Sequence, residues 1–88
     1  MTDAPAMRVV DGPDKHALQW ALTYPESGRV RFQIDDTPVD AAIDEMAEQV
    51  DGWTFDLKGR LASGPDKGAP FHGTYCVQSR SGSLFLAR

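Results

Sequence analysis

The chain has 88 residues, of which 41% are hydrophobic and 25% are charged, a composition typical of one soluble globular domain. Thirteen acidic and nine basic residues give a net charge of −4, which argues against direct binding to nucleic acid or to anionic membranes. The apolar runs are too short to span a bilayer, so no membrane partner is expected. A single cysteine and the lack of a signal-peptide pattern favour a cytoplasmic location.

The N-terminal part of the chain alternates between hydrophobic and polar residues after a short tail at 1–6, which is predicted to be flexible. Residues 7–88 are predicted to form one domain. Between His16 and Tyr24 every second residue is large and apolar, which is typical of a half-buried strand. The first three predicted strands, separated by turns that contain Gly and Pro, cover residues 7–10, 16–24 and 29–34.

The hydrophobic period changes at Asp35, and the pattern predicts a helix over 37–51. Thr37 suits the N-cap, Pro38 suits the first helical position, and Gly52 suits the residue that follows the helix. The apolar stripe of this helix, with spacings of four, three and four residues, consists of Val39, Ile43, Met46 and Val50. The stripe is expected to pack against Leu18, Trp20, Phe32, Phe55 and Tyr75.

Period two returns after the predicted helix. The last three predicted strands cover residues 53–61, 71–78 and 83–87. Gly59 indicates a β-bulge or a close approach of another segment, and both tryptophans, Trp20 and Trp53, are expected in the core. The predicted fold class is therefore α+β: an antiparallel sheet of about six strands in the order β-β-β-α-β-β-β, with one amphipathic helix packed on one face.

The tetrapeptide Gly-Pro-Asp-Lys occurs twice, at 12–15 and at 64–67. A Thr-Tyr pair and a Ser-Gly turn follow each copy at similar distances. One interpretation is a duplicated three-strand unit with a site where the two halves meet. The other is that both copies are turns with the same local chemistry. Both interpretations stay open at the level of the sequence.

His72 and Cys76 fall on the same face of a predicted strand, where four residues separate their Cα atoms by about 13 Å. This distance is too long for a Cys–His nucleophile, so Cys76 is expected to titrate as an ordinary thiol. Neither a metal-ligand spacing nor a phosphate-binding loop is present, and no metal and no cofactor are expected. The sequence thus favours a protein without catalytic activity. A cleft near residues 62–70, with His72 and Cys76 beside it, is the alternative: a small-molecule site or a minor enzyme.

Charge is unevenly distributed along the chain. Residues 35–51 contain seven acidic residues and no basic residue. The carboxylates on the outer face of the predicted helix are Asp40, Asp44, Glu45 and Glu48, and the bases on the solvent face of the sheet include Arg31, Lys58 and Arg60. Because such surfaces steer and orient a protein partner, the predicted function is a small binding or regulatory module that acts through protein–protein contacts. A second copy of the chain is the other expected partner, because a chain of this length has a small core and formation of a homodimer would bury more surface.

Overall fold

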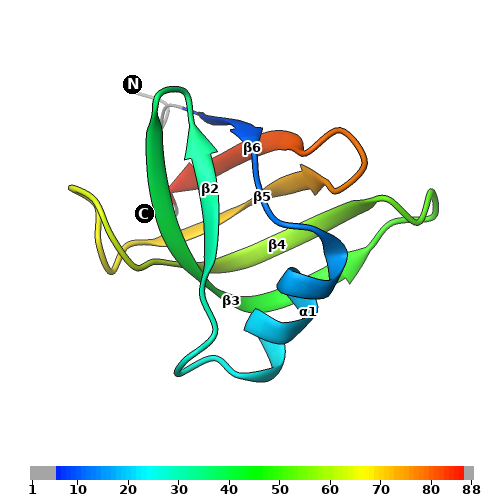
Figure 1. Ribbon diagram of the computed structural model, residues 1–88, viewed down its shortest axis with the longest axis horizontal. Helices are drawn as coiled ribbons and strands as arrows, with labels where there is room; N and C mark the ends of the chain where they lie inside the picture. Colours follow the sequence, from blue (N-terminus) through cyan, green and yellow to red (C-terminus); the bar gives the residue numbers. More distant parts are fainter. Residues whose placement is uncertain (1–5, 87–88) are drawn as a thin grey trace.

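A computed structural model describes residues 6–86, and within them six antiparallel strands close into a barrel (Figure 1). Each strand pairs with the next strand along the chain, and the last strand closes the sheet against the first. The elements in chain order are β1 (Met7–Asp11), α1 (Lys15–Thr23), β2 (Val30–Ile34), β3 (Thr37–Glu48), β4 (Thr54–Leu61), β5 (Pro70–Cys76) and β6 (Ser81–Leu86). Within these residues, no helix has the length and apolar character that a membrane span requires.

The predicted α+β class is wrong, because the predicted helix is a strand and one predicted strand is the helix. Residues 37–48 form β3, and residues 15–23 form α1. The other five predicted strands are confirmed, with ends that differ by one or two residues. Of the predicted tail, only Ala6 lies within the described residues, and Ala87 of the last predicted strand lies outside them.

β3 has the hydrophobic spacing of a helix because it contains a β-bulge. Val39, Ala41 and Ile43 are buried at every second position, as in an ordinary strand. The register with β4 then shifts between Ile43 and Glu45, and the extra residue returns Met46 to the inner face. β2 and β4 pair with β3 on its two sides and satisfy its backbone as a strand, despite the good helix propensity of its sequence.

α1 occupies most of the segment whose alternation predicts a strand. The Asp14 side chain accepts a hydrogen bond from the Ala17 amide at 2.8 Å and caps the first turn. Leu18 and Ala21 are fully buried three residues apart, so the apolar residues also fit one helical face. Trp20 lies on the exposed face of the same helix, which explains why its predicted burial is wrong.

The core fills the interior of the barrel with side chains from α1 and from all six strands. The ring of Phe32 meets those of Phe71 and Tyr75 edge to face, with centroids 6.4 Å and 5.4 Å away. The predicted core residues that are buried are Leu18, Phe32, Val39, Ile43, Phe55 and Tyr75. Met46 is only partly buried, and Trp20, Val50 and Trp53 are exposed.

The two Gly-Pro-Asp-Lys segments have different structures. The first connects β1 to α1, whereas the second lies in the loop between β4 and β5. The two segments lie at opposite ends of the barrel in Figure 1 and line different hollows. The three-strand unit expected from a duplication is therefore not present, because the first copy leads into a helix and the second into a strand.

Candidate functional site

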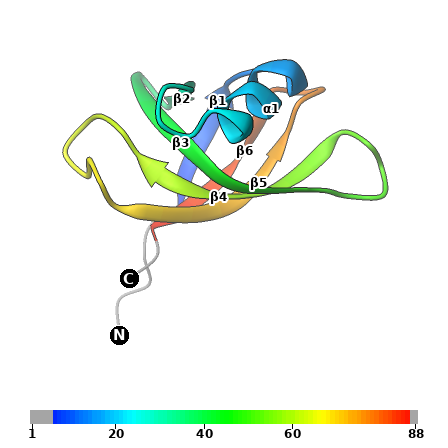
Figure 2. The same cartoon turned by 90° about the horizontal axis from the view of Figure 1, so that it is seen from below.

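The outward residues of β3, β4, β5 and β6 form one continuous face on the side of the barrel away from α1 (Figure 2). The registers place one residue from each strand side by side, in the row Glu45, Lys58, His72 and Phe85. The next row along the strands begins with Ala47, Asp56 and Thr74. We call these seven residues the outer patch: Glu45, Ala47, Asp56, Lys58, His72, Thr74 and Phe85.

A shallow hollow of about 580 Å³ lies over the outer patch. On its β5–β6 side, the ring of Phe85 stacks on the imidazole of His72, with centroids 5.7 Å apart and 25° between the planes. Phe85 is 36% exposed, so part of its side chain is accessible to a partner. On the β3–β4 side, Lys58 Nζ lies 3.6 Å from Glu45 Oε2. The hollow therefore has an aromatic side and a charged side.

Asp56 lies on β4, in the row next to that of Lys58. Its Oδ1 accepts hydrogen bonds from Gln49 Nε2 at 3.0 Å and from Thr74 Oγ1 at 3.4 Å. Its Oδ2 accepts none from a side chain within residues 6–86. The carboxylate is thus held in position by two neighbours while one oxygen stays available to a ligand.

The acidic and basic surfaces expected from the sequence are a single mixed surface. Because the acidic segment is a strand, each of its four predicted site carboxylates faces a base on a neighbouring element. The pairs are Asp40 with Arg31 at 2.9 Å, Asp44 with Arg60 at 3.9 Å, Glu45 with Lys58 at 3.6 Å, and Glu48 with Lys15 at 2.8 Å. The predicted acidic helix face is therefore wrong, and these exposed pairs contribute little stability each.

Five of the predicted site residues come together at or beside the outer patch, and four do not. Those that come together are Asp44, Glu45, Lys58, Arg60 and His72. Arg31 and Asp40 form a pair on the β2–β3 hairpin, and Glu48 contacts α1 through Lys15. Cys76 lies at the other end of β5, where the register places Thr54 and Ser81 beside it.

The Cys76 thiol departs from the expectation of ordinary titration. The hydroxyl and the backbone amide of Ser79 stabilise the thiolate and lower the pKa of Cys76. The side chain is only partly exposed. His72 lies two register positions away on the same outer face of β5, which agrees with the expected absence of a direct Cys–His pair on this strand.

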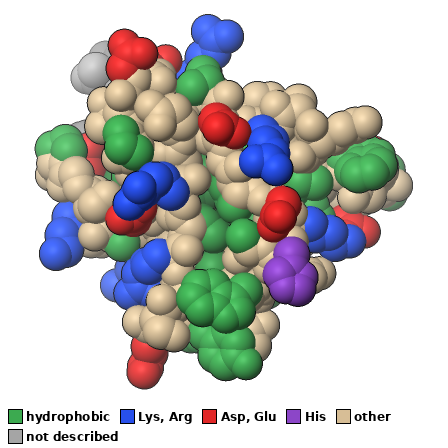
Figure 3. Space-filling view, in the orientation of Figure 1, with side chains coloured by type: hydrophobic (Ala, Val, Ile, Leu, Met, Phe, Trp, Pro, Cys, Tyr) green, Lys and Arg blue, Asp and Glu red, His purple; other side chains and the backbone are tan. Residues whose placement is uncertain are grey.

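Sequence reasoning missed a group of exposed aromatic residues. Trp20, Tyr24 and Trp53 are each about half exposed. The ring of Trp20 on α1 lies near that of Tyr24, the residue that follows the helix, with centroids 6.0 Å apart. Figure 3 shows hydrophobic side chains gathered over α1 and, separately, at the turn between β3 and β4. Trp20 with Tyr24, and Trp53, thus form two separate exposed regions outside the outer patch.

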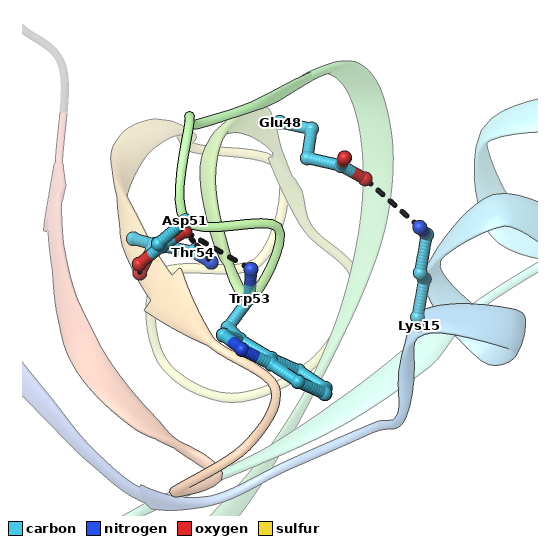
Figure 4. Close-up of polar contacts among 5 residues, drawn as sticks. All are labelled: Lys15, Glu48, Asp51, Trp53 and Thr54. Atoms are coloured by element: carbon cyan, nitrogen blue, oxygen red, sulfur yellow. Dashed lines mark hydrogen bonds and ion pairs between the residues drawn. The ribbon is translucent and has the colours of Figure 1, made fainter.

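Polar contacts hold the β3–β4 turn and the beginning of α1 in place (Figure 4). Asp51 Oδ1 accepts hydrogen bonds from the amides of Trp53 at 3.0 Å and Thr54 at 2.9 Å, and its Oδ2 accepts the Thr54 hydroxyl at 2.6 Å. These bonds, the hydroxyl bond first, lower the pKa of Asp51. The Asp-Gly-Trp-Thr sequence is a recognisable Asx-turn signal, and it could have placed Trp53 in a turn.

No protein-family model, curated protein or solved structure gives a significant match to this chain. Within residues 6–86, no three His, Cys, Asp or Glu side chains come together as metal ligands. The function is therefore inferred from the geometry of the surface.

Proposed function

We propose that the protein is a small non-enzymatic binding module that recognises a partner protein through the outer patch. The observation that carries this proposal is the exposed Phe85 ring stacked on His72 at the edge of a hollow, with charged residues across from it. In protein interfaces, a few aromatic residues supply most of the binding energy, and polar residues surround them. The outer patch has this composition.

The rigidity of the outer patch supports the same function. Each of the four strands that present it is paired on both sides within the closed barrel. A surface held in this way loses little conformational entropy when a partner binds, which leaves more of the interaction energy for affinity.

The chemistry of the hollow favours an arginine side chain of the partner as its occupant. The available Oδ2 of Asp56 can accept a guanidinium N–H, and the accessible part of the Phe85 ring can contact the guanidinium group. Glu45 and Lys58, paired beside the hollow, would orient the partner rather than attract it by net charge.

The proposal is tested by replacing one exposed ring on the outer patch and one elsewhere. Phe85→Ala and Tyr24→Ala each remove an exposed aromatic side chain, and thermal unfolding shows whether both variants keep the fold. We expect the immobilised Phe85→Ala variant to capture about tenfold less of the partner from a native lysate than the wild type does, because aromatic contacts supply much of the binding energy of an interface. Tyr24→Ala should retain as much as the wild type. If only Tyr24→Ala loses the partner, the binding surface lies at α1 and not at the outer patch.

A second candidate function is binding of a small molecule in a neighbouring hollow. This hollow of about 700 Å³ adjoins the β4–β5 loop and is lined by residues that include Arg60, Pro70 and His72. It corresponds to the cleft expected near residues 62–70, without Cys76. Titration of the labelled chain with small-molecule fragments tests this function, because ligands in this hollow shift the amide signals of Phe71 and His72 first.

A further inference from the structure

The junction between β1 and β2 is the least complete in the barrel. Within the described residues, these strands pair only at Val9 with Ile34 and at Asp11 with Gln33, and the register shifts between the two pairs. β2 pairs with β3 over five positions. β1 turns away from β2 toward α1 (Figure 1), so the first part of β2 has a paired strand on one side only.

The register of the β2–β3 hairpin shows which backbone groups are left open. Ile34 and Thr37 flank a two-residue turn and form the hydrogen-bonded pair next to it. Because such pairs alternate along an antiparallel ladder, Phe32 is hydrogen-bonded to β3 while the amide and carbonyl of Arg31 point toward β1. Those groups lie beyond the last paired residue of β1, at an exposed position. An open backbone edge of this kind is a template for an added strand.

A hollow of about 350 Å³ lies at this open edge. We call it the seam groove; its lining includes Asp11, Gly12, Arg29, Val30, Arg31 and Gln33. Figure 3 shows hydrophobic side chains at the bottom of a depression in the middle of this face, with charged side chains around it. The groove is on the α1 side of the barrel, away from the outer patch (Figure 2).

Arg29 lines the seam groove and Arg80 lies beside its Gly12 wall, and neither forms an ion pair within residues 6–86, although the Asp11 carboxylate also lines the groove. Arg29 Nη1 donates to the carbonyl oxygens of Pro25 at 2.7 Å and Gly28 at 2.9 Å. Arg80 Nη1 lies 3.5 Å from the carbonyl oxygen of Gly12, which belongs to the groove wall. Neutral carbonyl groups thus hold both guanidinium groups, and both remain available to an anionic occupant.

We infer that the seam groove binds an extended acidic segment of a partner polypeptide, which adds a short strand to β2. The backbone of the segment pairs with the open amide and carbonyl of Arg31. Its carboxylates face Arg29 and Arg80, and its alternate apolar side chains enter the hydrophobic floor. This mode of recognition takes affinity from main-chain hydrogen bonds and specificity from the charges.

The test is an NMR titration of the ¹⁵N-labelled chain with the synthetic peptide acetyl-Glu-Val-Glu-Val-Glu-amide. We expect the largest shift changes at the amides of Gly12, Arg31 and Gln33. Arg29→Glu should weaken binding about tenfold, because it replaces attraction with repulsion at the groove. Arg8→Glu is the matched control: Arg8 is a β1 base outside the groove lining, and the same charge change should alter affinity less than about twofold.

Two further reagents separate strand addition from general electrostatics. A peptide N-methylated at both valines and at the central glutamate keeps its charge but loses the backbone donors that either strand orientation would use, and it should bind about tenfold more weakly. Arg80→Glu repeats the charge reversal at a second position if Arg29→Glu fails to fold. Equal binding of the methylated peptide, equal losses in the Arg8 and Arg29 variants, or shift changes confined to other surfaces would overturn the inference.

Discussion

Gly59 of β4 lies so close to the carbonyl group of Ala42 in β3 that any side chain at position 59 would overlap with it. Gly59 pairs with Ile43, the last residue of β3 before the register shift. The expectation that Gly59 marks a bulge or a close approach is therefore confirmed. The close contact adjoins the bulge that brings Glu45 opposite Lys58, and so it supports the geometry of the outer patch.

Replacing Gly59 should destabilise the barrel. Gly59→Ala must displace the Ala42 carbonyl or the Phe71 ring, and we expect it to lower the free energy of unfolding by about 1–3 kcal/mol in a denaturant titration. Gly52→Asn serves as the control, because Gly52 has a φ of +76° and open space around it, which asparagine tolerates. An unchanged midpoint for Gly59→Ala would contradict the close packing of β3 and β4.

Ile43 and Val50 distinguish the strand from the helix that the sequence suggests. Ile43 is fully buried, so Ile43→Ala should cost about 2–5 kcal/mol of unfolding free energy. Val50 is fully exposed in the β3–β4 turn, and Val50→Ala should change stability by less than about 0.5 kcal/mol. Comparable losses in the two variants would instead support a helical stripe that buries both side chains.

The two Gly-Pro-Asp-Lys segments should respond differently to the same substitution. Asp14→Ala removes the N-cap of α1, and we expect it to lower the free energy of unfolding by about 1 kcal/mol. Asp66→Ala changes an exposed loop residue that caps no helix, so thermal and chemical unfolding should be unchanged. A similar loss at both positions would indicate equivalent local structures and revive the duplication.

The pH dependence of stability should include a contribution from Asp51. Its pKa is lower in the folded protein than the ordinary value near 4, because Thr54 and Trp53 donate hydrogen bonds to the carboxylate. The folded state is therefore stabilised above about pH 4, and this contribution is lost as the pH falls through the folded pKa. Asp51→Asn should flatten the decline of stability between about pH 4 and pH 2. An unaltered decline in the variant would show that the turn does not depend on the carboxylate.

Much of the sheet could be predicted from the sequence, because strands with one buried face keep strict alternation. β4 is the clearest example: Phe55, Leu57 and Leu61 are buried as predicted, with Gly59 on the same face. β3 could not be predicted in this way, since its bulge shifts the hydrophobic phase and imitates a helix. The pairing that decides its structure involves β2 and β4 together, and a local pattern does not contain this information.

The candidate site was predictable only in part, because its members come from four strands. The charges of Glu45 and Lys58 and the imidazole of His72 are visible in the sequence, but their common row depends on the register. The sequence does not indicate that Phe85 is exposed, because its exposure depends on the phase of β6. The alternation around Trp20 wrongly indicates a core position, because a short segment with apolar residues at 18, 20, 21 and 22 fits both a strand and a helix.

Photo-crosslinking from the centre of the outer patch tests the proposed binding function most directly. A photo-reactive amino acid is placed at Thr74, which lines the hollow, or at the exposed control position Gln19 on α1, in cells that naturally express the chain. We predict a defined covalent adduct with a partner protein from position 74, its loss when Phe85→Ala is added, and no such adduct from position 19. An adduct that forms from position 19 but not from position 74, or that persists in the Phe85→Ala variant, would contradict the assignment of the binding site to the outer patch.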